Sequence, residues 1–223
     1  SVDDLVARSP EEFRRSGIDV RTRHEVISID TEARTVEVRD LDRDAVSTER
    51  YDELLIATGA SPLRPPLPGI DSLGVFDLRT IPDLVALDAA LDGASTAVVV
   101  GAGYIGLEVA EAFVARGLGV SVVEAAARPM TTLDSDMADL VSVALENMGV
   151  ELHLGSAVRS FRTGDDGSVS AVVTDRVELP ADVVVVGLGA RPNTSLARAA
   201  GIPVGGSGGI VVDRRQRSRV DHV

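Results

Sequence analysis

The sequence predicts an α/β fold built around a parallel βαβ unit, and three observations predict it. The β-branched run Ala97–Val100 is typical of a buried parallel strand. A glycine-spaced turn follows it at once, and Tyr104–Ala115 has the apolar periodicity of a helix. A second run, Val120–Glu124, then supplies the second strand of the unit.

Composition sets limits on function. The chain has 223 residues, 44% of them apolar, which suffices for one large domain or two small ones. The net charge of −13 argues against a nucleic-acid surface, which needs clustered Lys and Arg. The absence of cysteine excludes disulfides and thiol nucleophiles within this sequence, and the three histidines lack the spacing of metal ligands.

No apolar run approaches the ~18 residues of a membrane span, and the polar N-terminus is unlike a signal peptide. We therefore expect a cytoplasmic protein that acts on a small molecule, with no membrane or nucleic-acid partner.

The N-terminal third predicts a short helix followed by strands. Ser9, Pro10 and Glu12 form a capping box with proline at the first helical position. Alternating apolar residues then predict extended structure within residues 18–30 and 35–40, with turns after each.

The apolar run Leu54–Ile56 predicts a further strand, buried on both faces. Four prolines between residues 62 and 68 indicate a semi-rigid linker and a domain boundary. The remaining elements are predicted as helices at 82–91 and 135–148, a strand within 149–155, a hairpin over 157–175, a buried strand within 181–193 and a short strand at Ile210–Val212.

The turn inside the βαβ unit has the pattern G-x-G-x-x-G at Gly101, Gly103 and Gly106. The first glycine permits a tight turn, the second leaves room for a pyrophosphate, and the third lets helix and strand pack closely. The pyrophosphate would then meet unpaired N–H groups at the start of the helix. A packing turn that binds no ligand is the alternative.

The acidic residue Glu124 ends the second strand, where a carboxylate can accept hydrogen bonds from the adenine ribose. The same charge would repel a 2′-phosphate, and no basic residue follows until Arg128. Arg128 is itself a candidate for contact with the cofactor. The pattern therefore favours NAD over NADP.

Three side chains at the helix start complete the candidates that follow from the residues. Tyr104 should lie at the mouth of the site, and Glu108 shares its face one turn later. Ile105 is also a candidate, although the periodicity predicts it on the buried face together with Val109, Ala112 and Phe113. The alternative for Glu108 is a surface charge near a helix N-terminus.

Several motifs together resemble one family. The segments "YDELLIATGASP", "VVVGAGYIGLEVAEAF", "VVVVGLGARPNTSLA" and "GGIVVD" resemble the pyridine nucleotide-disulfide oxidoreductases, which use FAD and NAD. The N-terminal "SPEEFRRSGIDVRTRHEVISID" is most similar to the coenzyme A-disulfide reductase and NADH oxidase branch. The ferredoxin-reductase branch shares "GYIGLEVA" and "RPNT", so it remains an alternative.

The resemblance implies further site residues. Ala57, Thr58 and Gly59 match an "ATG" element where the backbone passes close to FAD, and Val26 matches a hairpin residue at the adenine of FAD. Gly189 falls in the loop that borders the nicotinamide, and the tyrosine and glutamate of the helix start match positions beside it. Hydride transfer needs no general base, so we assign no catalytic residue, and no residues have the spacing of metal ligands.

The resemblance also implies a Rossmann-type NAD-binding domain with a β-hairpin meander at 75–190, and an incomplete FAD-binding domain. The latter comprises residues 1–74 and a return segment at 191–223. It further implies that the sequence is a piece of a longer, homodimeric enzyme. That enzyme would pass a hydride from NADH to FAD and on to a disulfide, such as coenzyme A disulfide, or to oxygen. The alternatives are an electron-transfer reductase of the ferredoxin or rubredoxin type, and a nucleotide-binding module without turnover.

Overall fold

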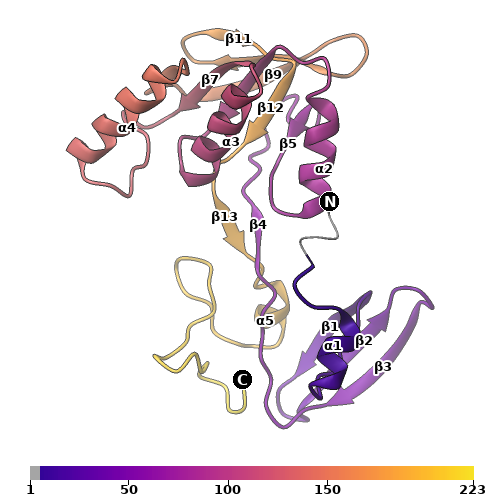
Figure 1. The fold of residues 1–223 in the computed structure, drawn as a ribbon. Helices are drawn as coiled ribbons and strands as arrows, with labels where there is room; N and C mark the ends of the chain where they lie inside the picture. Colours follow the sequence, from indigo (N-terminus) through magenta and orange to yellow (C-terminus); the bar gives the residue numbers. More distant parts are fainter. Residues whose placement is uncertain (1–5) are drawn as a thin grey trace. The chain divides into compact units, whose positions relative to one another are not determined.

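The computed structural model describes residues 6–223, which divide into two units (Figure 1). Unit 2 is the continuous stretch Pro62–Ala190, and unit 1 takes the described residues up to Ser61 together with Arg191–Val223. The chain passes between the units in β4 (Ala60–Pro62) and again in β13 (Ala190–Pro192), two short strands that pair with each other.

Unit 2 is built on a five-stranded parallel sheet with the order β5-β12-β6-β7-β8. The strand that comes last in sequence, β12, lies between β5 and β6, so the chain returns to the middle of the sheet. The strands are β5 (Val75–Phe76), β6 (Thr96–Val100), β7 (Gly119–Glu124), β8 (Glu151–Leu154) and β12 (Val183–Val186).

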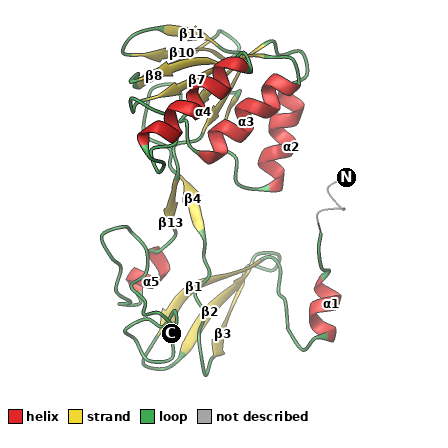
Figure 2. Ribbon diagram, turned by 60° about the vertical axis from the view of Figure 1, so that its left-hand side comes forward, coloured by secondary structure: helices red, strands yellow, loops and turns green. Residues whose placement is uncertain are grey.

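Both faces of this sheet are covered, by helices on one face and by a second sheet on the other (Figure 2). The three helices are α2 (Ile81–Ala90), α3 (Tyr104–Ala115) and α4 (Ser135–Asn147). The second sheet is antiparallel with the order β11-β10-β9, from β9 (Val158–Thr163), β10 (Val169–Thr174) and β11 (Glu178–Pro180).

The all-valine strand β12 illustrates why a continuous apolar run is needed here. Val183 and Val185 pack with the helices, including Phe113, while Val184 and Val186 pack with the antiparallel sheet, including Phe161. Successive side chains of a strand point to opposite faces, so a strand covered on both faces is apolar at every position.

Unit 1 holds an antiparallel meander and two short helices. Its helix α1 (Pro10–Arg15) begins with the capping box of Ser9 and Glu12 that the sequence predicts. The other elements are the strands β1 (His24–Asp30), β2 (Thr35–Asp40) and β3 (Ala45–Arg50) and the helix α5 (Ser195–Ala199).

The structure corrects the sequence prediction at several elements. Leu54–Ile56 forms no strand, and Leu55 is 84% exposed. Ile210–Val212 is not a strand either, because only Ile210 makes an isolated bridge, to Val204. The prediction missed β3, whose residues are mostly exposed and polar, and it also missed β4, β5, β11, β13 and α5, which are all short.

On α3 the predicted buried face is wrong at two positions. Ile105 is 51% exposed and Ala112 is also exposed, whereas Val109 and Phe113 are buried as predicted. Among the described residues, no helix is long and apolar enough to cross a membrane.

Candidate functional site

A hollow of about 410 Å³ lies in unit 2, among the loops that follow β6, β7 and β12. Ligands of open parallel sheets bind at this carboxyl edge of the strands. We call it the unit 2 hollow, and its lining residues are Gly101, Ala102, Gly103, Tyr104, Ile105, Glu124, Met130, Thr131, Gly187, Leu188 and Gly189.

The three glycines of the turn have different surroundings. Gly101 has a φ of +103°, and a Cβ there would lie 2.5 Å from the carbonyl oxygen of Gly187. A Cβ on Gly106 would lie only 2.0 Å from the carbonyl oxygen of Gly101. A Cβ on Gly103 would meet nothing within 4 Å, so this glycine borders open space. Two glycines therefore permit close packing, and the middle one leaves the hollow open.

The start of α3 offers free backbone donors to the unit 2 hollow. Gly103 is its N-cap and supplies no side-chain hydrogen bond, and the first intrahelical bond runs from the Leu107 N–H to the Gly103 carbonyl. The N–H groups of the first turn therefore have no intrahelical partner. Such a turn, at the positive end of the helix, attracts an anion.

Glu124 lies in the same hollow, and the backbone fixes its carboxylate. One oxygen accepts a hydrogen bond from the Ala102 N–H at 2.9 Å, and the other accepts one from the Ala126 N–H at 2.8 Å. A carboxylate oxygen can accept further bonds, so both remain available to a ligand. Glu124 thus joins the glycine turn to the loop after β7.

The exposed aromatic ring of Tyr104 lines the unit 2 hollow and is 62% exposed, as the sequence predicts for a residue at the mouth. Ile105 and Gly189 line the same hollow. Glu108, by contrast, lines a separate, mostly apolar hollow between α2 and α3, together with Leu84 and Phe113. Tyr104 and Glu108 therefore do not line one cavity.

Arg128 is close to this site in sequence, but its side chain is engaged elsewhere. Its Nε donates to Asp139 Oδ1 at 2.6 Å and its Nη2 to Asp139 Oδ2 at 3.4 Å. This hydrogen-bonded pair raises the pKa of Arg128 further above its ordinary value. Arg128 does not line the unit 2 hollow.

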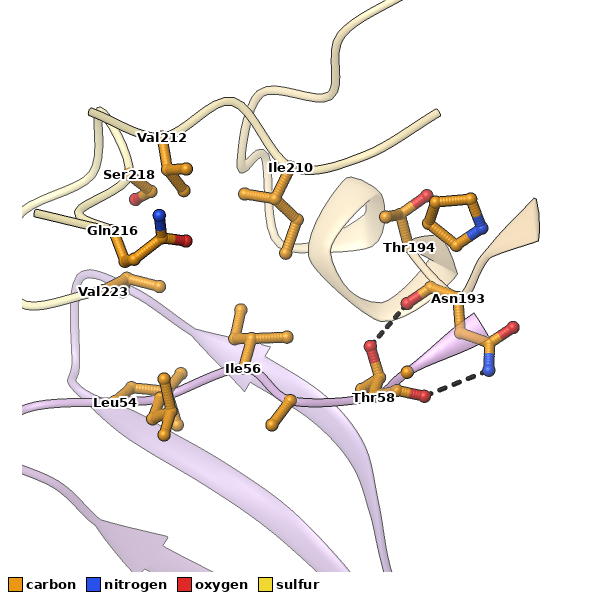
Figure 3. A pocket seen from close by; sticks show the side chains of 14 residues that line it. Leu54, Ile56, Thr58, Asn193, Thr194, Ile210, Val212, Gln216, Ser218 and Val223 are labelled. Carbon is orange, nitrogen blue, oxygen red and sulfur yellow. Dashed lines mark hydrogen bonds between the residues drawn. The ribbon is translucent and has the colours of Figure 1, made fainter. Parts of the chain in front are cut away.

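Ala57, Thr58 and Gly59 line a second hollow, of about 240 Å³, which lies within unit 1 (Figure 3). Ile56 and Ile210 point toward one another across it. We call it the unit 1 hollow. The "ATG" segment is thus part of a concave surface.

Asn193 holds this segment in place. It donates from Nδ2 to the Thr58 carbonyl at 3.0 Å and from its backbone N–H to the Gly59 carbonyl at 2.9 Å, and its own carbonyl accepts from the Thr58 hydroxyl at 2.6 Å. Within the described residues, the N–H groups of Ala57, Thr58 and Gly59 donate no hydrogen bond. Val26 lies on β1, 40% exposed, and lines neither hollow.

Sequence reasoning missed several residues of both hollows. In unit 2 these include Met130, Thr131 and Leu188, which lie in loops after β7 and β12. Loop residues of this kind carry no periodicity, although the glycines flanking Leu188 mark a turn. In unit 1, Asn193 follows the "RP" of a recognised motif, and its position there was the available signal.

Comparison with known proteins identifies relatives of the whole chain. A "NAD(P)H sulfur oxidoreductase (CoA-dependent)" of Pyrococcus abyssi is 35% identical, over 99% of this chain and 49% of its own length. A "rhodocoxin reductase" of Rhodococcus erythropolis is 37% identical, over 99% of this chain and 50% of its own length. The chain therefore spans about half the length of these curated relatives.

A solved structure shares the fold closely. The water-forming NADH oxidase from Lactobacillus brevis, bound to NADH, superposes with a TM-score of 0.90 at 35% identity, over 98% of this chain and 48% of that one. The family model of the pyridine nucleotide-disulphide oxidoreductases matches residues 4–223. The glycine turn, the carboxylate at the end of β7 and this match agree, and the chain belongs to the pyridine nucleotide-disulphide oxidoreductase family.

Proposed function

We propose that unit 2 binds NADH and that the chain is part of a flavoprotein oxidoreductase. In this enzyme a hydride passes from NADH to FAD and then to a disulfide, such as coenzyme A disulfide, or to oxygen. One observation carries the proposal. The glycine turn, the free N–H groups of α3 and the carboxylate of Glu124 all meet in one hollow.

The pyrophosphate of NADH fits the backbone at the start of α3. The open space beside Gly103 accommodates it, and the N–H groups of Tyr104 and Ile105 are available as donors. Binding by backbone donors needs no basic side chain, which suits a hollow whose lining has none.

The adenine ribose fits Glu124. Ribose hydroxyls can donate to the lone pairs that the Ala102 and Ala126 N–H groups leave free. A 2′-phosphate has no hydrogen to donate at neutral pH and carries a charge of the same sign, so NADPH should bind more weakly. This supports NAD as the preferred dinucleotide.

We assign the nicotinamide end to Tyr104 and Gly189, which line the same hollow. Hydride transfer requires the donor to be held against the acceptor, and it does not require a general base. Tyr104 would orient the nicotinamide and exclude water. No side chain of this chain has to donate or accept a proton in the hydride transfer. Glu108 stays a candidate for contact with the cofactors.

The flavin fits the unit 1 hollow, where the free N–H groups of Ala57, Thr58 and Gly59 could meet its oxygen atoms. The bonds from Asn193 hold this segment and already satisfy the carbonyls of Thr58 and Gly59. When bound, FAD supplies the redox chemistry that connects NADH with the final acceptor. Val26 remains a candidate for the adenine of FAD.

The final acceptor distinguishes two candidate functions. The relative with a CoA-dependent name favours a disulfide or sulfur acceptor, whereas the rhodocoxin reductase favours electron transfer to a redox protein. The chain contains no cysteine, so a thiol that reacts with the acceptor would come from outside this sequence. We also propose that the whole enzyme is a cytoplasmic homodimer.

Titration with NADH, NADPH and FAD tests the proposal, with Glu124→Gln as the diagnostic variant. The wild-type chain should bind NADH at least about tenfold more tightly than NADPH. Glu124→Gln keeps the shape of the side chain but loses its charge, so it should weaken NADH binding by about tenfold, or about 1.4 kcal/mol. It should also reduce the difference in affinity between NADH and NADPH. Equal binding of the two dinucleotides by the wild type would contradict the assignment of Glu124.

Turnover with an artificial electron acceptor separates the enzyme from a binding module. NADH binding without retained flavin or turnover would support a nucleotide-binding module for this chain. For the whole enzyme, coenzyme A disulfide, oxygen and a small ferredoxin can be compared as acceptors. Preferential reduction of the ferredoxin would favour the electron-transfer alternative.

A further inference from the structure

The loop that connects β7 with α4 lines part of the unit 2 hollow and contains one basic residue, Arg128. Glu124, the last residue of β7, and Met130, within the loop, line that hollow, and Arg128 lies between them in the sequence. A guanidinium in such a loop is suited to bind a phosphate bidentately. Nevertheless, the Arg128 side chain does not line the hollow.

Asp139 accounts for the position of this side chain. It lies in the first turns of α4, and both its oxygens accept hydrogen bonds from the Arg128 guanidinium, at 2.6 and 3.4 Å. The Arg128 and Asp139 side chains are 48% and 58% exposed. The pair is therefore open to solvent and accessible to a competing anion.

We propose that Asp139 is a specificity-determining residue for the dinucleotide, because it engages the one cation of the β7–α4 loop and thereby denies it to a 2′-phosphate. The inference rests on the proposed function, since it takes the unit 2 hollow as the NADH site. In this view two carboxylates disfavour NADPH in different ways. Glu124 repels the phosphate directly, whereas Asp139 acts through Arg128 and is a positioning residue.

The ribose of NADH carries no phosphate, so release of Arg128 should change NADH binding little. For NADPH, Arg128 released by Asp139→Asn becomes available as a partner for the phosphate. The gain in affinity should be about fivefold, corresponding to the roughly 1 kcal/mol that an exposed Arg–carboxylate pair contributes. Arg176, whose guanidinium lies beside Gly155, is another cation near this edge of the sheet.

Dissociation constants for NADH and NADPH, measured by calorimetry on the full chain, test the inference. The variants are Asp139→Asn, Arg128→Met with Asp139→Asn, and the matched control Asp136→Asn. Asp136 lies at the same helix start and is exposed, and among residues 6–223 its carboxylate accepts a hydrogen bond only from the neighbouring Met137 N–H. The Asp136→Asn variant therefore loses the same charge without releasing Arg128. Thermal unfolding verifies that each variant folds.

The inference predicts tighter NADPH binding only for Asp139→Asn, with NADH affinity within about twofold of wild type. Loss of that gain in the double variant would support the role of Arg128. An unchanged NADPH affinity in Asp139→Asn, an equal gain in Asp136→Asn, or a gain that persists without Arg128 would overturn it. If the wild type binds neither dinucleotide, the proposed function itself fails, which is a distinct result.

Discussion

At the scale of single residues, the glycine turn separates folding from binding. Gly101 and Gly106 are needed because backbone atoms of neighbouring segments occupy the space of a side chain. Gly103 faces open space, and its lack of a side chain matters only when a ligand occupies the hollow. The same residue type therefore serves packing at two positions and, in the proposed function, recognition of the dinucleotide at the third.

A pair of alanine substitutions tests this division. Gly106→Ala should lower the free energy of unfolding by about 3 kcal/mol, because its Cβ would lie 2.0 Å from a carbonyl oxygen. Gly103→Ala should lower the free energy of unfolding by less than about 1 kcal/mol, because Gly103 is an N-cap, but it should weaken NADH binding at least tenfold. Urea denaturation and NADH titration measure the two effects. A Gly103→Ala variant that binds NADH normally would contradict the pyrophosphate assignment.

At this scale the sequence predicted part of the lining of the candidate site. The turn, Tyr104 and Glu124 follow from a motif whose spacing reflects the chemistry of a dinucleotide, and the structure brings them into one hollow. The engagement of Arg128 by Asp139 could not be predicted, because it depends on the path of the intervening loop. Glu108 shares a helix face with Tyr104, yet the neighbouring α2 places it in another hollow.

At the scale of elements, two apolar runs with similar composition have different structures. Val183–Val186 is a central strand because parallel neighbours on both sides satisfy its backbone. Leu54–Ile56 has no strand partner in the described chain and forms a wall of the unit 1 hollow instead. An apolar run predicts burial, but only the tertiary structure decides whether partners are present. The helix α3, which glycines precede and follow, was predicted with its observed bounds.

A carboxylate joins the neighbouring strands β6 and β12 of unit 2 at their amino ends. Asp182, just before β12, accepts hydrogen bonds on Oδ2 from the backbone N–H groups of Ser95 and Thr96, both at 2.9 Å. The hydroxyl groups of the same two residues also donate to it. The bond from the Ser95 N–H, followed by that from Thr96, lowers the pKa of Asp182 below its ordinary value.

Asp182→Asn should therefore destabilise unit 2 in a pH-dependent way. At pH 7 we expect the free energy of unfolding to fall by about 1 kcal/mol. Hydrogen bonds to a buried charge would contribute more, but this carboxylate is largely exposed. The wild-type carboxylate contributes fully above the unfolded pKa of about 3.9, and its contribution disappears as the pH falls through the lowered folded pKa.

Urea denaturation between pH 7 and pH 2.5 measures this difference between wild type and Asp182→Asn. Asp165→Asn, an exposed change in the β9–β10 turn, is the control and should show no such difference. A stability difference for Asp182→Asn that is independent of pH would show that the ionised carboxylate is not what joins the strands.

At the scale of the whole molecule, the two units differ in how much they bury. Unit 2 has two apolar clusters, one on each face of its parallel sheet. In the described part of unit 1, the buried apolar side chains are Val38, Ala197 and Ile202. The larger core gives unit 2 the rigid framework that a preorganised site requires. Every residue of the unit 2 hollow belongs to that one unit.

The most direct test of the central claim is an NMR titration of the isotope-labelled chain with NADH, following the backbone amides. We predict saturable shifts that are largest at Gly103, Tyr104 and Ile105, accompanied by shifts at Ala102 and Ala126, whose N–H groups hold Glu124. NADPH should require at least about tenfold higher concentrations. Largest shifts outside residues 62–190, or equal affinity for the two dinucleotides, would contradict the claim that unit 2 is an NADH site.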